Sequence, residues 1–72
     1  MIKIVYYSET IDNWGGTKSS TKPKKIHSVL NDSDNFSDDM VFKGSNGEIY
    51  FIDDLINKEV IVEGFEPFIV CD

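Results

Sequence analysis

The chain has 72 residues, one cysteine, one histidine and a formal charge of −6. This length allows one small domain with a small hydrophobic core, and a single thiol excludes an intramolecular disulfide. One cysteine and one histidine also supply too few ligands for a structural zinc site.

The residue usage is biased. Arginine, alanine and glutamine are absent, which is typical of an AT-rich genome, and we therefore expect a phage or prophage origin. There is no run of about 18 apolar residues, and the opening residues MIKIVYYSE lack the long apolar segment of a secretory signal. We expect a cytoplasmic protein that does not contact membranes.

The charges are divided unevenly along the chain. Residues 1–30 contain five lysines and two acidic residues, a net charge of +3, whereas residues 31–72 contain two lysines and eleven acidic residues, a net charge of −9. Such a division predicts a basic segment on an acidic body, and it bears on binding partners more than on the fold.

The first predicted element is a strand at residues 2–7, IKIVYY, because these residues are β-branched and aromatic. An uninterrupted strand places Ile2, Ile4 and Tyr6 on one face. Residues 8–23 follow with two glycines and six serines or threonines, and they predict a flexible basic loop.

The next segment, residues 24–30 with the sequence KKIHSVL, predicts a second strand in which Ile26 and Leu30 share a face. A short helix at 24–32 is the alternative. Residues 31–39 are polar and rich in aspartate, and they predict an acidic connector.

Residues 40–52 predict a β-hairpin. The pair Asn46-Gly47 is the strongest short signal for a two-residue type I′ turn, because both residues tolerate positive φ angles. With these two residues as the turn, Phe42 pairs with Phe51 on the core side. Such an aromatic pair contributes roughly 0.2–1 kcal/mol relative to two alanines.

Short elements complete the chain. Residues 53–55 predict a single helical turn capped by Asp53. Residues 59–65, EVIVEGF, predict a strand, and residues 67–70, PFIV, predict a last edge strand, because proline is tolerated at a strand start.

The order of these elements resembles that of an SH3-like barrel over residues 2–63, with GEIYFIDDL and EVIV as the most specific part. We therefore expect a single all-β domain over residues 1–72, a small SH3-like barrel of about five strands with one short helical turn. An α+β fold with a short helix at 24–32 is the alternative. Small barrels support many unrelated functions.

No catalytic or metal-binding pattern is present in the sequence. His27 and Cys71 lack the supporting third group that a nucleophilic pair requires. A calcium loop that begins at Asp32 lacks the glycine and the closing glutamate of an EF-hand. We therefore expect no catalytic residue, no metal and no cofactor.

The basic loop and the acidic connector are the predicted binding site. Lysines beside a tryptophan and two glycines combine charge, an aromatic face and backbone freedom, although Trp14 could instead cap the end of the barrel. The predicted partner-binding residues are Trp14, Lys18, Lys24, Lys25, Asp32, Asp34, Asp38 and Asp39.

From this pattern we expect a small acidic protein that is not an enzyme and that binds, and thereby inhibits, a host or defence protein. One alternative is a nucleic-acid-binding module that uses the lysine-rich loop, but the acidic body opposes a polyanion. Another alternative is a self-associating structural protein, a homodimer for example, because a small core and exposed edge strands favour association.

Overall fold

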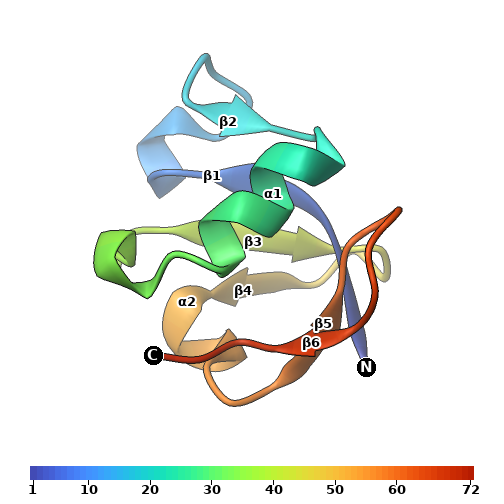
Figure 1. Cartoon of the computed structure of the whole chain (residues 1–72). Coiled ribbons are helices and arrows are strands. Elements are labelled where there is room, and N and C mark those ends of the chain that lie inside the picture. Colours follow the sequence, from blue (N-terminus) through green and yellow to red (C-terminus); the bar gives the residue numbers. More distant parts are fainter.

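The structure, a computed structural model, describes residues 1–72 and combines a mixed six-stranded sheet with two α-helices (Figure 1). The strands are β1 (Ile2–Ser8), β2 (Ser19–Ser20), β3 (Val41–Gly44), β4 (Ile49–Phe51), β5 (Glu59–Ile61) and β6 (Phe68–Ile69). The helices are α1 (Pro23–Leu30) and α2 (Ile52–Leu55), and two 3-10 turns are η1 (Ile11–Asn13) and η2 (Ser33–Asn35). The fold is therefore mainly β or α+β.

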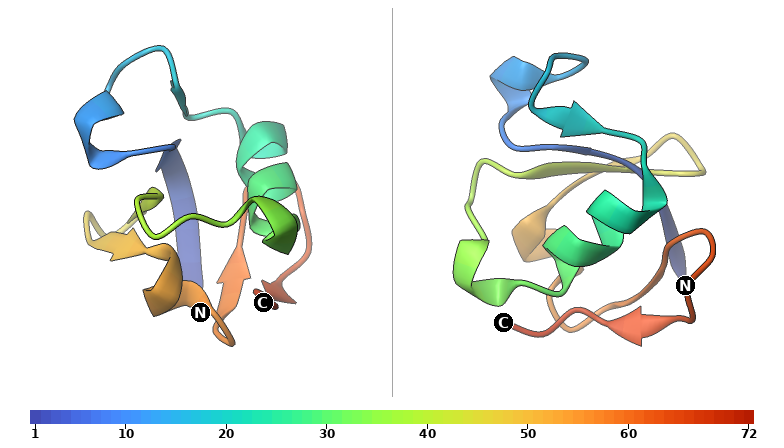
Figure 2. Two further views of the ribbon diagram at one scale, coloured as in Figure 1. Left: turned by 90° about the vertical axis from the view of Figure 1, so that its left-hand side faces the viewer. Right: turned by 45° about the horizontal axis from the view of Figure 1, so that its top comes forward.

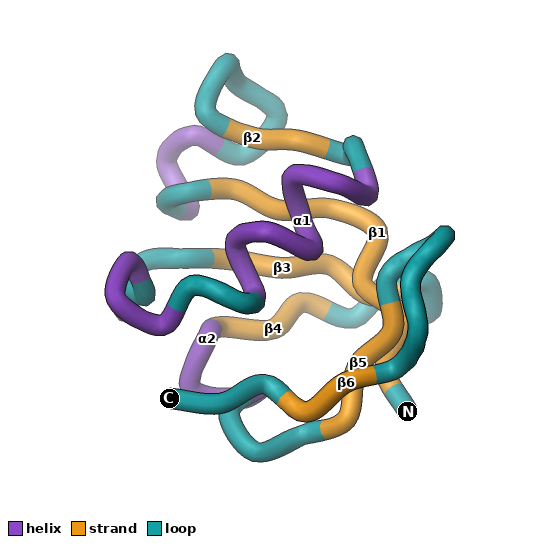
Figure 3. The backbone as a smooth tube through the Cα atoms, in the orientation of Figure 1, coloured by secondary structure: helices purple, strands orange, loops and turns teal.

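The sheet is built around β1. Its strand order is β4-β3-β1-β5-β6, and β2 also pairs with β1. β1 is antiparallel to β2 and β3 and parallel to β5. Figures 1 and 3 show the N-terminal end of β1 bending away from β3 towards β5, which gives the sheet strong curvature. The sheet is not closed, so the expected SH3-like barrel is not confirmed.

The segment predicted as a second strand forms the helix α1 instead. The spacing of Ile26 and Leu30, both 1% exposed, puts them on one side of a strand and equally on one side of a helix. Pro23 occupies the start of α1. An N–H at this position has no partner within the helix, so proline costs no hydrogen bond there, and its fixed φ is already helical. The strand prediction is wrong, and the alternative helix at 24–32 is confirmed in type.

The sheet has two different faces, which we call inner and outer. α1 covers the inner face, and η1 lies on the opposite, outer side (Figure 2, left). Eleven buried side chains form the core beneath α1: Ile4, Tyr7, Ile26, Leu30, Met40, Phe42, Ile52, Leu55, Val60, Val62 and Val70.

The turn of the β3–β4 hairpin differs from the predicted one. The backbone N–H of Gly47 donates to the carbonyl of Gly44 (3.0 Å), and the N–H of Gly44 donates to the carbonyl of Glu48 (2.9 Å), which leaves a three-residue loop. Gly47 has a φ of +84°, whereas Asn46 does not have a positive φ. This pattern fits a type I turn followed by a bulge, so the two-residue type I′ turn is wrong.

The longer loop shifts the strand register by one residue. Phe42 therefore pairs with Tyr50, and Phe51 pairs with Val41. Successive side chains point to opposite faces, so a slip of one residue turns every side chain of the second strand over. The predicted pairing of Phe42 with Phe51 is wrong, and Phe51 lies on the outer face.

A bulge in β1 changes the predicted faces of that strand too. Ile4 pairs with Gly44 but Tyr6 pairs with Lys43, so one extra residue lies between them on β1. After the bulge, Tyr7 points into the core and is 4% exposed. Tyr6 therefore does not share the inner face with Ile4 as predicted.

The elements at the end of the chain lie where they were predicted. α2 includes residues 53–55 and β6 lies within 67–70, whereas β5 covers only the first three residues of the strand predicted at 59–65. The cap of α2 differs in detail, because the carboxylate that accepts the backbone N–H of Phe51 (3.0 Å) belongs to Asp54.

Candidate functional site

The structure distributes the predicted basic loop over both faces of the sheet. Residues 8–23 contain η1 and β2, and β2 pairs with the end of β1. Trp14 lies on the outer face, where its ring meets that of Tyr6 edge-on with centroids 4.3 Å apart. Lys18 and Lys25 line a small groove on the inner side. The predicted basic loop therefore contributes to two separate surfaces.

The remaining predicted residues are spread over α1 and the segment between α1 and β3. Lys24 is exposed in the first turn of α1. Asp32 lines a cavity beside α1, whereas Asp34 in η2 and both Asp38 and Asp39 before β3 are exposed. No three His, Cys, Asp or Glu side chains lie close enough together to hold a metal ion.

The outer face carries a group of apolar and aromatic side chains around one lysine. Cross-strand pairing aligns Tyr6 with Lys43 and Lys43 with Ile49, and paired residues point to the same side of a sheet. Phe51 is two residues from Ile49 along β4, so it shares this face. We call the following set the outer patch: Tyr6, Trp14, Lys43, Ile49 and Phe51.

The outer patch leaves large apolar side chains in contact with solvent. Trp14 is 39% exposed, Ile49 44% and Phe51 43%. Single exposed apolar residues are ordinary, but several on one face are typical of an interaction surface. A tryptophan at its margin adds the side chain most often found at binding hot spots.

Local hydrogen bonds fix the position of Trp14. The backbone N–H of Trp14 donates to the carbonyl of Ile11 (3.2 Å), and the next N–H, from Gly15, donates to the Tyr6 hydroxyl. Within the same turn, Nδ2 of Asn13 donates to Oγ1 of Thr10 (2.9 Å). The indole is therefore presented by an ordered turn, which lowers the entropy lost when a partner binds.

Acidic residues flank the outer patch in sequence. Asp12 is two residues from Trp14, Glu48 is next to Ile49, and Asp53 is two residues from Phe51. The carboxylate of Asp54 accepts the Phe51 N–H at the free edge of β4. Because this bond occupies one of the few donors of the edge strand, the face of β4 is better suited to binding than its edge.

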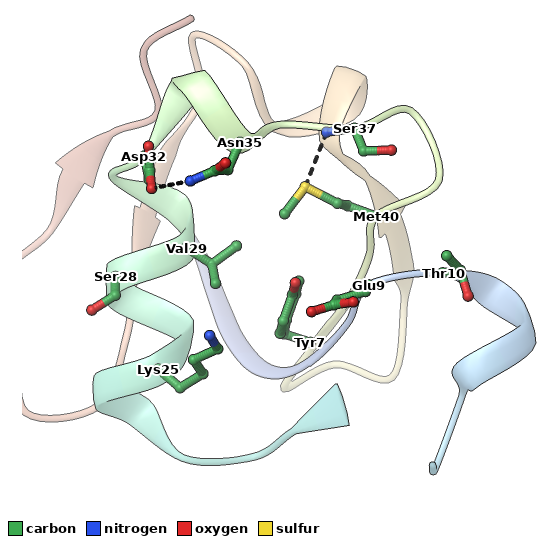
Figure 4. Close-up of a pocket in the computed structure, with 10 residues that line it drawn as sticks. All are labelled: Tyr7, Glu9, Thr10, Lys25, Ser28, Val29, Asp32, Asn35, Ser37 and Met40. Carbon is green, nitrogen blue, oxygen red and sulfur yellow. Dashed lines mark hydrogen bonds between the residues drawn. The ribbon is translucent and has the colours of Figure 1, made fainter. Parts of the chain in front are cut away.

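The inner side contains a cavity of about 500 Å³ between α1 and the C-terminal end of β1 (Figure 4). α1 contributes Lys25, Ser28 and Val29, whose helical spacing places them on one side of the helix, and the chain after α1 contributes further lining residues. The ten lining residues are Tyr7, Glu9, Thr10, Lys25, Ser28, Val29, Asp32, Asn35, Ser37 and Met40.

Tyr7 lies at the centre of this cavity. Figure 4 shows its hydroxyl directed into the open space, and the two hydrogen bonds drawn among the lining residues do not include it. Those bonds join Asn35 to Asp32, and the N–H of Ser37 to the sulfur of Met40. Burial, with a smaller contribution from the charge of Glu9, raises the pKa of Tyr7. Its hydroxyl therefore remains neutral at physiological pH.

His27 and Cys71 are held in separate surroundings. The His27 ring stacks on Phe65 with centroids 3.9 Å apart and meets Phe68 edge-on at 5.1 Å. Cys71 is exposed, and its thiol approaches the carbonyl of Ile69. These contacts give the histidine a packing role between α1 and the chain around β6.

Sequence reasoning missed every residue of the outer patch except Trp14, and it missed Tyr7 of the cavity. The bulge between Ile4 and Tyr6, which determines the faces of Tyr6 and Tyr7, has no marker such as glycine in the sequence. Gly47 does not decide the register of β4, because glycine at the third position of a three-residue hairpin loop is as suitable as glycine in a two-residue type I′ turn.

The chain matches no protein-family model, and neither the curated proteins nor the solved structures include a significant match to it. Neither helix has the length and apolar character that crossing a bilayer requires.

Proposed function

We propose that this chain is a binding protein without enzymatic activity, encoded by a phage or prophage, that inhibits a host or defence protein by stoichiometric binding through the outer patch. One observation carries this proposal: Trp14, Ile49 and Phe51 are each about 40% exposed on the same face. The strands and the ordered turn after η1 hold these side chains in place before binding. The residue usage, which is typical of an AT-rich genome, supports the proposed origin.

The expected partner has an apolar surface surrounded by basic residues. The apolar part of that surface would cover the indole of Trp14 and the ring of Phe51, both of which lose water on binding. Acidic residues flank the patch, and the whole chain carries a charge of −6. Lysines and arginines around the partner's apolar surface would complement this charge and accelerate association.

Two outer-patch variants and one control test this proposal. After capture of a partner from a lysate of the source host, the complex is rebuilt from purified proteins and its stoichiometry and affinity are measured by calorimetry. Trp14→Ala should weaken binding by about 2 kcal/mol, roughly thirtyfold, and Phe51→Ser should act in the same direction. Ile69→Ser is the matched control, because Ile69 is 50% exposed on β6, outside the patch.

Results of two kinds would contradict this assignment. If Ile69→Ser weakened the complex as much as Phe51→Ser, the outer patch would not be the contact surface. If the purified chain formed dimers in sedimentation that Phe51→Ser dissociated, the patch would serve self-association, as in a structural protein.

Nucleic-acid binding is the second candidate function, and the placement of four lysines favours it. Lys18, Lys22, Lys24 and Lys25 are all exposed on the segment that leads through β2 into α1. If they bind phosphates, DNA affinity should fall steeply with salt, by roughly 0.7 to 0.9 in the log–log slope per neutralised phosphate. Tight DNA binding at physiological salt, lost in a Lys24→Gln, Lys25→Gln variant, would replace the proposal above.

A further inference from the structure

The cavity beside α1 contains the hydroxyl of Tyr7, a polar group that has no hydrogen-bond partner in the protein. Tyr7 is 4% exposed, yet its hydroxyl points into the open space and makes no hydrogen bond with the other lining residues (Figure 4). Every fully buried side-chain nitrogen or oxygen atom in the protein has a hydrogen-bond partner. The Tyr7 oxygen has none, so it is not fully buried and faces the cavity. The Tyr7 hydroxyl is therefore open to a ligand in the cavity, as donor or as acceptor.

The charged groups around the hydroxyl are of both signs. Lys25 lies in the first turn of α1 and Asp32 follows the end of the helix, so the two side chains lie at different ends of the cavity (Figure 4). Glu9 lies across the cavity on the chain after β1, close enough for its charge to act on Tyr7. Two carboxylates and one ammonium thus surround the space, so a ligand that carries both a positive and a negative group can pair with charges of each sign.

The apolar part of the lining lies between these charges. Val29 projects from α1 and Met40 from the segment before β3, on either side of the Tyr7 ring (Figure 4). A volume of about 500 Å³ lies within the range of small-molecule sites, which place a few polar groups around an apolar surface. The cavity therefore suits a small compound with charged groups and an aliphatic part.

We propose that this cavity binds a small zwitterion, a compound of amino-acid size with one ammonium group, one carboxylate group and an aliphatic part. The ligand's ammonium group is attracted by Glu9 and Asp32, and its carboxylate pairs with Lys25. The Tyr7 hydroxyl hydrogen-bonds the ligand between them. This site is on the inner side of the sheet and is independent of the proposed partner surface.

Titrations followed by two-dimensional NMR of the isotope-labelled chain test this site with three related compounds. Leucine carries both charges, leucinamide lacks the carboxylate, and 4-methylpentanoate lacks the ammonium group. Leucine should give saturable shifts at the amides of the lining residues, with millimolar affinity. Each of the other two compounds should bind at least about tenfold more weakly, because each leaves a charged group in the cavity without its partner.

Two matched variants identify the role of the hydroxyl. Tyr7→Phe keeps the ring in the core and should weaken leucine binding about tenfold or more, because it removes one hydrogen bond to a charged ligand. Tyr6→Phe, its neighbour on the outer face, should leave the affinity unchanged. The proposal is overturned if leucine gives no saturable shifts, if all three compounds bind equally, or if the two variants bind leucine equally well in folded protein.

Discussion

Tyr6 and Tyr7 are neighbours of the same type, and they serve opposite faces of one sheet. Tyr6 lies on the outer face, supports the Trp14 ring and accepts the N–H of Gly15. Tyr7 lies on the inner face, packs in the core and directs its hydroxyl into the cavity. The bulge after Ile4 determines which tyrosine takes which face. A bulge in the backbone thus determines which tyrosine faces the cavity and which faces the outer patch, and the residue types alone do not.

The two faces also differ in how they are covered. α1 covers the inner face and buries Ile26 and Leu30 there. The outer face has only η1 and the following turn near it, and Ile49 and Phe51 remain accessible. The inner face therefore carries the main core, whereas the outer face buries Val41 and leaves Ile49 and Phe51 exposed.

The largest expected difference between the faces concerns their phenylalanines. Phe42, on the inner face, is 0% exposed, whereas Phe51, on the outer face, is 43% exposed. Phe42→Ala should lower the free energy of unfolding by about 3–5 kcal/mol, because it leaves a core cavity. Phe51→Ala should lower it by less than about 1 kcal/mol. Urea denaturation of both variants measures these values.

The milder variant Phe42→Leu allows the comparison even if Phe42→Ala does not fold, since small domains have little stability to lose. It should cost about 1 kcal/mol. Equal losses for Phe51→Leu and Phe42→Leu would place both rings in the core, as a two-residue turn at Asn46-Gly47 requires.

A smaller effect is expected at the turn that sets the register of β4. Gly47 has a φ of +84°, and no atom lies within 4 Å of the position that a Cβ would take there, so Gly47→Ala introduces backbone strain without a clash. It should destabilise the chain by about 1–2 kcal/mol. Ser45→Ala in the same loop keeps the backbone bond to Lys3 and should change stability by less than about 0.5 kcal/mol. Thermal or urea unfolding that ranks them equally would exclude this turn.

The sequence predicts most helices and strands of this fold, but it does not predict which side chains point to which face of the sheet. Hydrophobic content and turn residues are local, so the strands near residues 2–7, 40–52, 59–65 and 67–70 follow from them. Register and bulges depend on contacts between distant segments. The spacing of Ile26 and Leu30 fits a strand and a helix alike, so Pro23 was the better guide to α1.

The candidate surfaces were less predictable than the fold, for the same reason. Trp14 and the lysines of the basic loop are residue types that are common in binding sites. The structure places Trp14 on the outer face of the sheet and Lys25 on the inner side. Ile49 and Phe51 are ordinary strand residues by sequence. They become part of a surface because a three-residue loop turns β4 over, and that loop is not distinguishable from a two-residue turn by composition alone.

The smallest expected effect is a difference between the Tyr7→Phe and Tyr6→Phe variants in how the free energy of unfolding depends on pH. Burial, and to a lesser degree Glu9, raises the pKa of Tyr7 above its ordinary value of 10.0. Between the unfolded and folded pKa values, the folded chain keeps a proton that the unfolded chain has lost. The stabilisation from this difference is fully present below pH 10 and is lost as the pH rises through the folded-state value. The free energy of unfolding, measured with urea across this alkaline range, should therefore decline less steeply in Tyr7→Phe than in the unmodified chain. Tyr6→Phe is the control from the outer face, and an equally shallow decline in both variants would show that the inner cavity does not set the titration of Tyr7.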